Sequence, residues 1–222
     1  MKKIKLLFLS IMFPAMIFAQ GGVEIVPFAG YMFGGSVKYS YYNYSPKLNI
    51  PNGLNYGVSL LVPVQSLVDI ELNWTRMDKV KGTFTSGGYS GPDFTDDELY
   101  VSTNYFQIGG ISKFYNGGDA VAQPFASFSL GATWFDTSPT SDSDYASYED
   151  VWKFSIMLGL GVKIMFSERV GIMLRGRLMM PMTFSGAGFY IGTGGSGMTM
   201  SSWVSPLQGD FNGGLIIKLG GS

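Results

Sequence analysis

The sequence predicts an all-β protein, an eight-stranded antiparallel up-and-down transmembrane β-barrel. The first observation is a long alternation of residue types between Trp152 and Phe166. Apolar residues occupy every even position of this segment, namely Trp152, Phe154, Ile156, Leu158, Leu160, Val162, Ile164 and Phe166. The odd positions, Lys153 to Met165, hold lysine, serine, glycine and methionine. This alternation indicates a strand with one apolar face, and its 15 residues exceed the roughly 9–11 that cross a bilayer.

The second observation is the spacing of the strands. Clusters of turn-forming residues separate eight strand candidates: Val23–Gly34, Leu54–Val64, Leu67–Lys79, Leu99–Tyr115, Pro124–Asp136, Val151–Phe166, Gly171–Met182 and Trp203–Leu219. The expected connections at 35–53, 80–98, 137–150 and 183–202 are long, whereas those at 65–66, 116–123 and 167–170 are short. Long and short connections that alternate in this way are typical of an outer-membrane barrel, with short turns in the periplasm and long loops outside.

The same alternation recurs in Leu67–Lys79, Gly171–Met182 and Trp203–Leu219, whereas Leu99–Tyr115 is less regular. In Leu99–Tyr115 both faces carry large apolar residues: Val101 and Tyr105 on one, Phe106, Ile108 and Phe114 on the other. We therefore expect a change of phase or a β-bulge near the middle of this strand.

The third observation is a targeting segment. Lys2, Lys3 and Lys5 precede a short apolar stretch that ends with a small residue, Ala19. This pattern predicts a secretory signal peptide at 1–19 and a single β-barrel domain at 20–222, rather than a retained membrane helix. Export would leave the N-terminus of the barrel on the periplasmic side of the outer membrane of a Gram-negative bacterium.

The composition excludes several classes of function. The chain has neither cysteine nor histidine, and so has no thiolate ligand, no imidazole base and no imidazole metal ligand. Its formal net charge is −1, and removal of the signal peptide would make it more negative, which argues against binding of nucleic acid. Charged residues make up 14% of the chain, against about 25% in soluble domains. We expect no cofactor, no metal site, no catalytic residue and no enzymatic activity.

Alternation alone also fits a soluble, lipocalin-like barrel that has its polar face outside. Three observations favour a membrane. The polar strand faces carry too little charge for a water-exposed surface, and the apolar faces are nearly free of charge. In addition, the four tryptophans fall on the apolar faces beside the long connections: Trp74, Trp134, Trp152 and Trp203. They predict one aromatic girdle of a membrane protein.

With the apolar faces outside, a set of charged residues faces the lumen: Glu24, Asp69, Glu71, Lys113, Lys153, Lys163, Arg175, Arg177, Asp210 and Lys218. An eight-stranded barrel is just wide enough to be filled by its own side chains, and buried charges must be paired. We therefore expect an ion-pair network across the lumen formed by Asp69, Glu71, Lys113, Lys163, Arg175, Arg177 and Asp210. Such a network acts either as a structural plug or as a gate in a polar conduit.

The signal peptide, eight strands and tight turns resemble the small outer-membrane β-barrel proteins of Gram-negative bacteria, the OmpX-like, OmpW-like and OmpA-barrel group. The resemblance implies a non-enzymatic barrel, since the outer-membrane enzymes of comparable fold use histidine. Its role would be structural or interactive, with outer-membrane lipids and lipopolysaccharide as partners and a place in a larger outer-membrane complex as one option. The tyrosine-rich loop around Tyr39–Tyr44 suits partner contacts. The OmpW-like resemblance implies the alternative, a narrow channel or transporter for small hydrophobic molecules.

Overall fold

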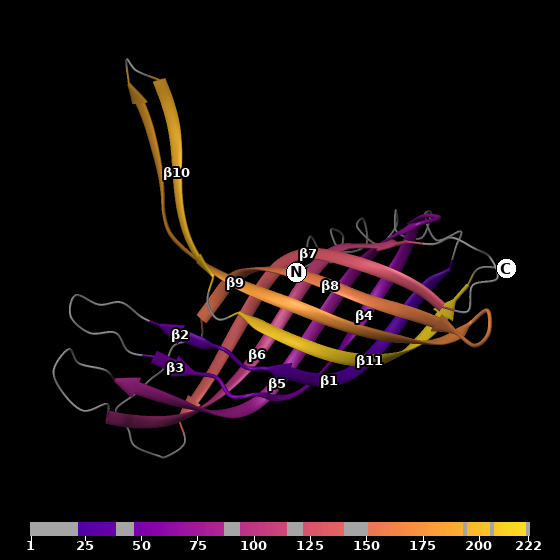
Figure 1. The fold of residues 1–222 in the computed structure, drawn as a ribbon, viewed down its shortest axis with the longest axis horizontal. Helices are drawn as coiled ribbons and strands as arrows, with labels where there is room; N and C mark the ends of the chain where they lie inside the picture. Colours follow the sequence, from indigo (N-terminus) through magenta and orange to yellow (C-terminus); the bar gives the residue numbers. More distant parts are fainter. Residues whose placement is uncertain are drawn as a thin grey trace, which may run out of the picture.

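Eight long antiparallel strands close into a barrel in the computed structural model (Figure 1). The structure describes residues 22–38, 47–86, 94–114, 122–139, 151–192, 195–204 and 207–220. The barrel strands are β1 (Val23–Phe33), β4 (Gly53–Gln65), β5 (Val68–Ser86), β6 (Phe94–Lys113), β7 (Ala122–Pro139), β8 (Val151–Met165), β9 (Val170–Gly192) and β11 (Gln208–Leu219). Pairing of β1 with β11 closes the sheet. The predicted fold class is confirmed. The described residues contain no helix long and apolar enough to span a membrane.

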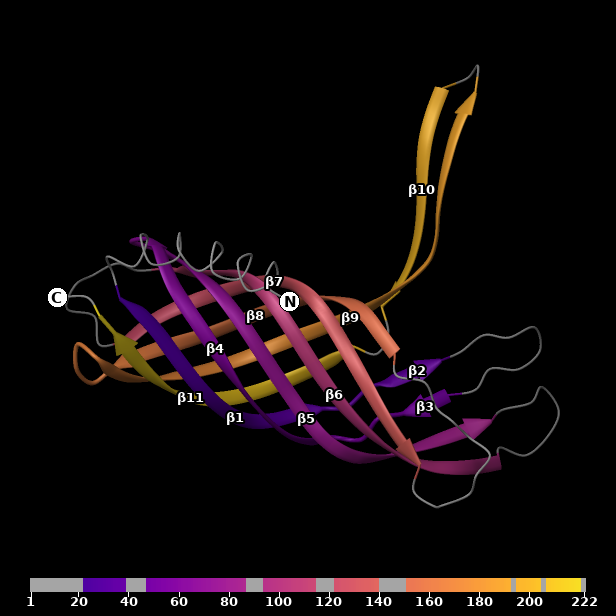
Figure 2. The same ribbon diagram turned by 180° about the vertical axis from the view of Figure 1, so that it is seen from behind.

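Three shorter strands lie at the end of the barrel that carries the long connections: β2 (Ser36–Lys38), β3 (Lys47–Asn49) and β10 (Gly195–Val204). β2 pairs with β3, which continues the sheet beside β5. β10 pairs with the outer part of β9, and this hairpin rises away from the barrel across its long axis (Figures 1 and 2).

The predicted bounds of the last two strands were therefore wrong. The segment expected as a loop at 183–202 is largely paired backbone, because β9 continues to Gly192 and returns as β10. Trp203 lies in β10, opposite Thr183, and the last barrel strand begins only at Gln208. The sequence did not predict these strands because glycine, serine and threonine interrupt the alternation of apolar and polar residues by which a strand is recognised.

In β8, side chains point alternately into the lumen and out of the barrel wall, as the alternation of residue types predicts. Ser155, Met157 and Lys163 are buried, whereas Leu158 and Leu160 are exposed on the outside of the wall. The predicted assignment of the even positions to the outer face is confirmed. The lumen is filled by charged, polar and apolar side chains, and the outer wall is apolar, as in transmembrane barrels.

The bulge predicted near the middle of the fourth barrel strand, β6, is absent. The pairing of β6 with β7 runs without a shift from Leu99 to Lys113. The pairing of β5 with β6 shifts at two other places, between Met77 and Val80 and between Phe84 and Thr85. Val101 and Tyr105 are buried inside, while Phe106 is exposed outside. Both faces of β6 are apolar because the lumen contains an apolar cluster at this level.

Candidate functional site in the barrel lumen

Two apolar clusters divide the lumen along the barrel. The cluster nearer the short turns contains Val26, Leu61, Ile111, Phe125, Met173 and Ile216. The cluster nearer the long connections contains Met32, Ile50, Met77, Val101, Tyr105, Phe135, Met157 and Met179. Along β9 the successive inward positions are Met173, Arg175, Arg177 and Met179. The two arginines therefore lie between the clusters.

Two ion pairs occupy this central layer. Arg177 donates from Nη2 to Asp210 Oδ2 at 2.5 Å and from Nε to Asp210 Oδ1 at 2.9 Å, a two-point contact. Arg175 Nη1 lies 2.5 Å from Glu71 Oε1. The side chains of Arg177 and Asp210 are 0% exposed. Because the two pairs share one buried layer, the charges of the guanidinium groups and carboxylates balance each other there.

A second charged group lies at the short-turn end. Asp69 accepts hydrogen bonds from Lys113 Nζ at 2.8 Å and from Lys163 Nζ at 2.9 Å. Lys163 also lies 2.8 Å from Glu24 Oε2. The structure thus brings all seven residues of the expected network into ion pairs and adds Glu24, although in two groups rather than one. Each group contains two carboxylates and two cations, so the paired charges cancel within each.

Neutral polar side chains complete the central layer. Ser59 Oγ donates to Glu71 Oε1 at 2.7 Å, and Asn55 Nδ2 donates to Asp210 Oδ2 at 2.5 Å. Arg177 Nη1 also donates to Thr75 Oγ1 at 2.9 Å. Glu71 Oε2 and Asn55 Oδ1 are buried polar atoms without a partner in the described structure. They mark points at which ordered water could complete the network.

Phe28 packs against the two arginines of the central layer, and the sequence did not predict this contact. The guanidinium carbons of Arg175 and Arg177 lie 5.5 and 4.8 Å from the centre of its ring, within cation–π range. A signal was available, since Phe28 shares its parity along the strand with the inward-facing Glu24. The reason for an aromatic ring at that position becomes visible only when the register brings β1 beside β11 and β9.

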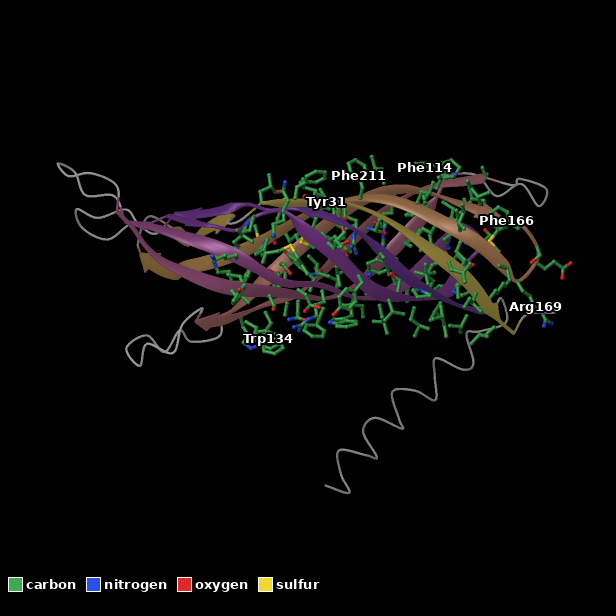
Figure 3. All side chains as sticks on the ribbon, turned by 90° about the horizontal axis from the view of Figure 1, so that it is seen from below. Tyr31, Phe114, Trp134, Phe166, Arg169 and Phe211 are labelled. Atoms are coloured by element: carbon green, nitrogen blue, oxygen red, sulfur yellow. The ribbon has the colours of Figure 1, made fainter. Side chains whose placement is uncertain are left out.

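The outer wall carries an aromatic group at the long-connection end. Trp134 and Trp152 are stacked with ring centres 5.6 Å apart, and Phe106 stacks on Trp152 at 6.1 Å. Trp74 meets Tyr56 edge to face at 6.1 Å. Trp134 lies on the outside of the wall, as do Tyr31 and Phe211 (Figure 3). Three of the four predicted girdle tryptophans are thus in barrel strands, and Trp203 is in β10.

The described residues contain no group of three or more acidic side chains placed to hold a metal ion. The sequence matches no protein-family model and no curated protein. Solved structures, however, share the architecture. The outer membrane protein OprG from Pseudomonas aeruginosa aligns with a TM-score of 0.59 and 11% identity, over 88% of this chain and 96% of OprG. The chain has the fold of the small outer-membrane β-barrels.

Two further structures show how widely this fold is shared. Neisserial surface protein A, NspA, aligns with a TM-score of 0.51 and 12% identity, over 89% of this chain and 97% of NspA. The outer membrane protease OmpT from Escherichia coli aligns with a TM-score of 0.52 and 7% identity, over 91% of this chain and 98% of OmpT. Because a protease is among them, the small outer-membrane barrel fold alone does not fix the activity.

Proposed function

We propose that this protein is a non-enzymatic integral outer-membrane β-barrel of a Gram-negative bacterium with a closed lumen. It acts as a structural or interaction protein through its extracellular loops. In this proposal residues 1–19 are removed as a signal peptide and the N-terminus lies in the periplasm. The absence of histidine from the sequence supports a role without catalysis, since histidine is the commonest general base.

The observation that carries the proposal is the Arg177–Asp210 pair, which is 0% exposed between two apolar clusters. A conducting polar pore requires hydrated charges along its path, whereas these charges bind each other. Opening a path past this layer would also separate Arg175 from Glu71, which joins opposite sides of the lumen. Breaking a buried pair typically costs about 3–5 kcal/mol. The paired layer therefore supports a lumen that stays closed.

Planar-bilayer recording of the purified barrel tests this. We expect no stable conductance from the wild type, and short openings from Arg177→Ala/Asp210→Ala, which removes both halves of the central pair. Asp78→Asn is the matched control, because Asp78 pairs with Arg76 on the outer wall and not in the lumen. Stable channels from the wild type would overturn the closed lumen.

One observation favours the alternative of a transporter for small hydrophobic molecules. A groove of about 620 Å³ opens on the outer wall over β8, β9 and β11. Its lining includes the exposed Leu160 and Phe211, the glycine Gly176, and both Arg177 and Asp210. This alternative requires a lateral path to open past Gly176 to the central layer. Uptake of a small apolar dye into proteoliposomes that contain the wild type, and not into empty liposomes, would favour this alternative.

An interaction role predicts a partner. The tyrosine-rich loop that includes 39–46 lies outside the described residues, so its sequence alone supports this part of the proposal. Purification from native membranes in mild detergent tests it, with copurified outer-membrane protein or lipopolysaccharide as the expected result. Release of the protein from cells without detergent would instead support the soluble, lipocalin-like alternative.

A further inference from the structure

The β9–β10 hairpin has a strand edge that no described residue covers. Beyond Met182, β9 leaves the barrel wall and pairs with β10, so that Thr183 lies opposite Trp203 and Gly192 opposite Gly195. Among the described residues β10 has no other neighbouring strand. Its second edge therefore presents backbone N–H and C=O groups to which a further strand can bind.

The edge of β10 lacks the features that keep exposed strand edges apart. Such edges usually carry charged residues, prolines or bulges. The sequence from Thr183 to Val204 contains no charged residue and no proline. The register of the hairpin shifts near its base, where the extra residue, Ser185, belongs to β9. β10 thus runs from Gly195 to Val204 as an uncharged strand without an inserted residue.

The hairpin also needs further strands for its own stability. A two-stranded hairpin is marginally stable in water, and three or more strands with a hydrophobic face are required for independent stability. The register places Ala187, Phe189 and Ile191 of β9 on the same face as Met198 and Met200 of β10. A sheet that continues beyond β10 would widen this apolar face and satisfy the open edge.

The absence of charge indicates which partner fits. In a contact between two identical edges, each residue near the symmetry axis approaches its own copy, so every charge there would repel itself. A different partner would impose no such restriction, because it could carry the opposite charge. The free edge of β9 is less suitable, since the neighbouring strand β8 is preceded in the sequence by Glu149 and Asp150, whereas β10 is followed by Ser205 and Pro206.

We propose that β10 pairs antiparallel with β10 of a second copy of this chain, so that a four-stranded sheet joins two barrels. The hairpin rises across the long axis of the barrel (Figures 1 and 2). In the proposed outer-membrane orientation that axis is normal to the bilayer, so the hairpins of neighbouring copies lie at the same level. The inference rests on the proposed interaction role and names the partner.

Symmetry restricts the register of this contact. A two-fold axis normal to the sheet leaves each residue on its own face, and residues directly opposite each other in a sheet share a face. The residue at the centre must therefore lie opposite its own copy. Two registers give the greatest overlap of β10 with itself: Thr199 at the centre, which pairs Gly195 with Trp203, or Met200 at the centre, which pairs Ser196 with Val204.

Cysteine cross-linking tests the contact, because the chain contains no cysteine of its own. The variants are Thr199→Cys and Met200→Cys, with Ser196→Cys and Ser202→Cys as matched controls on the same strand. Directly opposed residues have Cα atoms about 4.5–5.5 Å apart, which suits a disulfide. In either register the control cysteines would lie about 13 Å or more from their copies, too far for a disulfide.

Each full-length variant is oxidised in intact outer membranes and run on a non-reducing gel. We expect a cross-linked dimer from Thr199→Cys or Met200→Cys and none from the two controls. No dimer from either central variant would overturn the proposal, and so would equal cross-linking at all four positions, which indicates random collision. A product of any other mass would identify a different partner and would likewise overturn it.

A charge at the centre should separate the copies. We expect Thr199→Asp and Met200→Asp each to lower the fraction of dimer about tenfold or more, measured by analytical ultracentrifugation in mild detergent, since like charges would face each other. Ser196→Asp is the matched control, because its two charges would be farther apart than the Debye length of about 8–10 Å. The shift in gel mobility on heating confirms that each variant contains a folded barrel.

An unchanged dimer in both central variants, an equal loss in Ser196→Asp, or a monomeric wild type would overturn the contact. None of these measurements depends on conductance. A wild type that conducts but cross-links at the centre of β10 would refute only the closed lumen, whereas a silent barrel that fails to cross-link would refute only the pairing of two copies.

Discussion

Arg177 and Asp210 lie directly opposite each other on β9 and β11, so their ion pair joins neighbouring strands rather than opposite walls. Arg175, two residues earlier on β9, instead reaches Glu71 on β5, which is not a neighbour of β9 in the sheet. The same strand thus contributes one pair along the wall and one pair across the lumen. The first pair strengthens the sheet, and the second holds opposite sides of the barrel together.

Removing one half of the Arg177–Asp210 pair should destabilise the barrel strongly. Arg177→Met leaves the buried Asp210 carboxylate without its cation, and we expect a loss of about 3–5 kcal/mol in the free energy of unfolding. The double variant Arg177→Met/Asp210→Leu should lose less than Arg177→Met alone, because no unpaired charge remains. Urea unfolding in lipid vesicles, followed by tryptophan fluorescence, measures both. A double variant that loses as much as Arg177→Met alone would contradict this account.

Lys163 should matter more than Lys113, although both bind Asp69. Lys163 also bridges to Glu24, so Lys163→Met takes the cation from Glu24 and leaves Asp69 with Lys113 alone, whereas Lys113→Met leaves both carboxylates paired with Lys163. We expect Lys163→Met to cost about 3–5 kcal/mol, and Lys113→Met less than half of that. The same unfolding titration compares them. Equal losses would show that the bridge to Glu24 contributes nothing.

A charge on the outer wall should be costly in the middle of β8 and tolerated just beyond its end. Leu160 and Phe166 are both 65% exposed and lie outside the barrel, so they differ chiefly in depth (Figure 3 labels Phe166). Leu160→Arg should cost about 2–4 kcal/mol, and Phe166→Arg about 0–1 kcal/mol. Folding into vesicles, read from the shift in gel mobility between heated and unheated samples, measures the difference. Similar folding yields would be evidence against a bilayer around this wall.

Gly131 and Gly213 should differ in their tolerance of a methyl group. A Cβ at Gly131 would lie 1.9 Å from the carbonyl oxygen of Phe106, which the backbone cannot relieve cheaply, whereas a Cβ at Gly213 would meet only Leu174 Cδ2 at 3.4 Å. Gly131→Ala should cost about 1–3 kcal/mol, and Gly213→Ala should change stability by less than about 0.5 kcal/mol. Thermal unfolding of both variants in the same detergent provides the comparison. An equally stable Gly131→Ala would show that the wall can widen at β6 and β7.

Alternation made the barrel predictable because burial on one face of a strand leaves a period of two in the sequence. It gave the inward direction of Asp69, Lys163 and Arg177 correctly. Alternation could not identify their ion-pair partners, because these depend on the register of each strand against the next. Lys163 and Glu24 are 139 residues apart in sequence, and only the register of the whole sheet brings them together.

The errors arose where that period carries no information. The hairpin of β9 and β10 has no clear alternation of apolar and polar residues, so nothing in its sequence distinguishes it from a loop. In β6 the alternation is hidden by the apolar cluster in the lumen, which makes Val101 and Phe106 look alike although they face opposite ways. The buried donors Asn104 Nδ2 and Trp134 Nε1, which have no partner in the described structure, could not be foreseen, because the sequence does not show which hydrogen bonds are left unmade.

Pairing of β1 with β11 also dictates the order in which this barrel can form. Val23 meets Leu219, so the ring cannot close until the last strand has been delivered, and every partial assembly has two open strand edges. Contacts so distant in sequence make folding slow. During that interval the apolar wall and the unpaired edges are hazards for aggregation. Both remain open to contact with other chains until β11 pairs with β1.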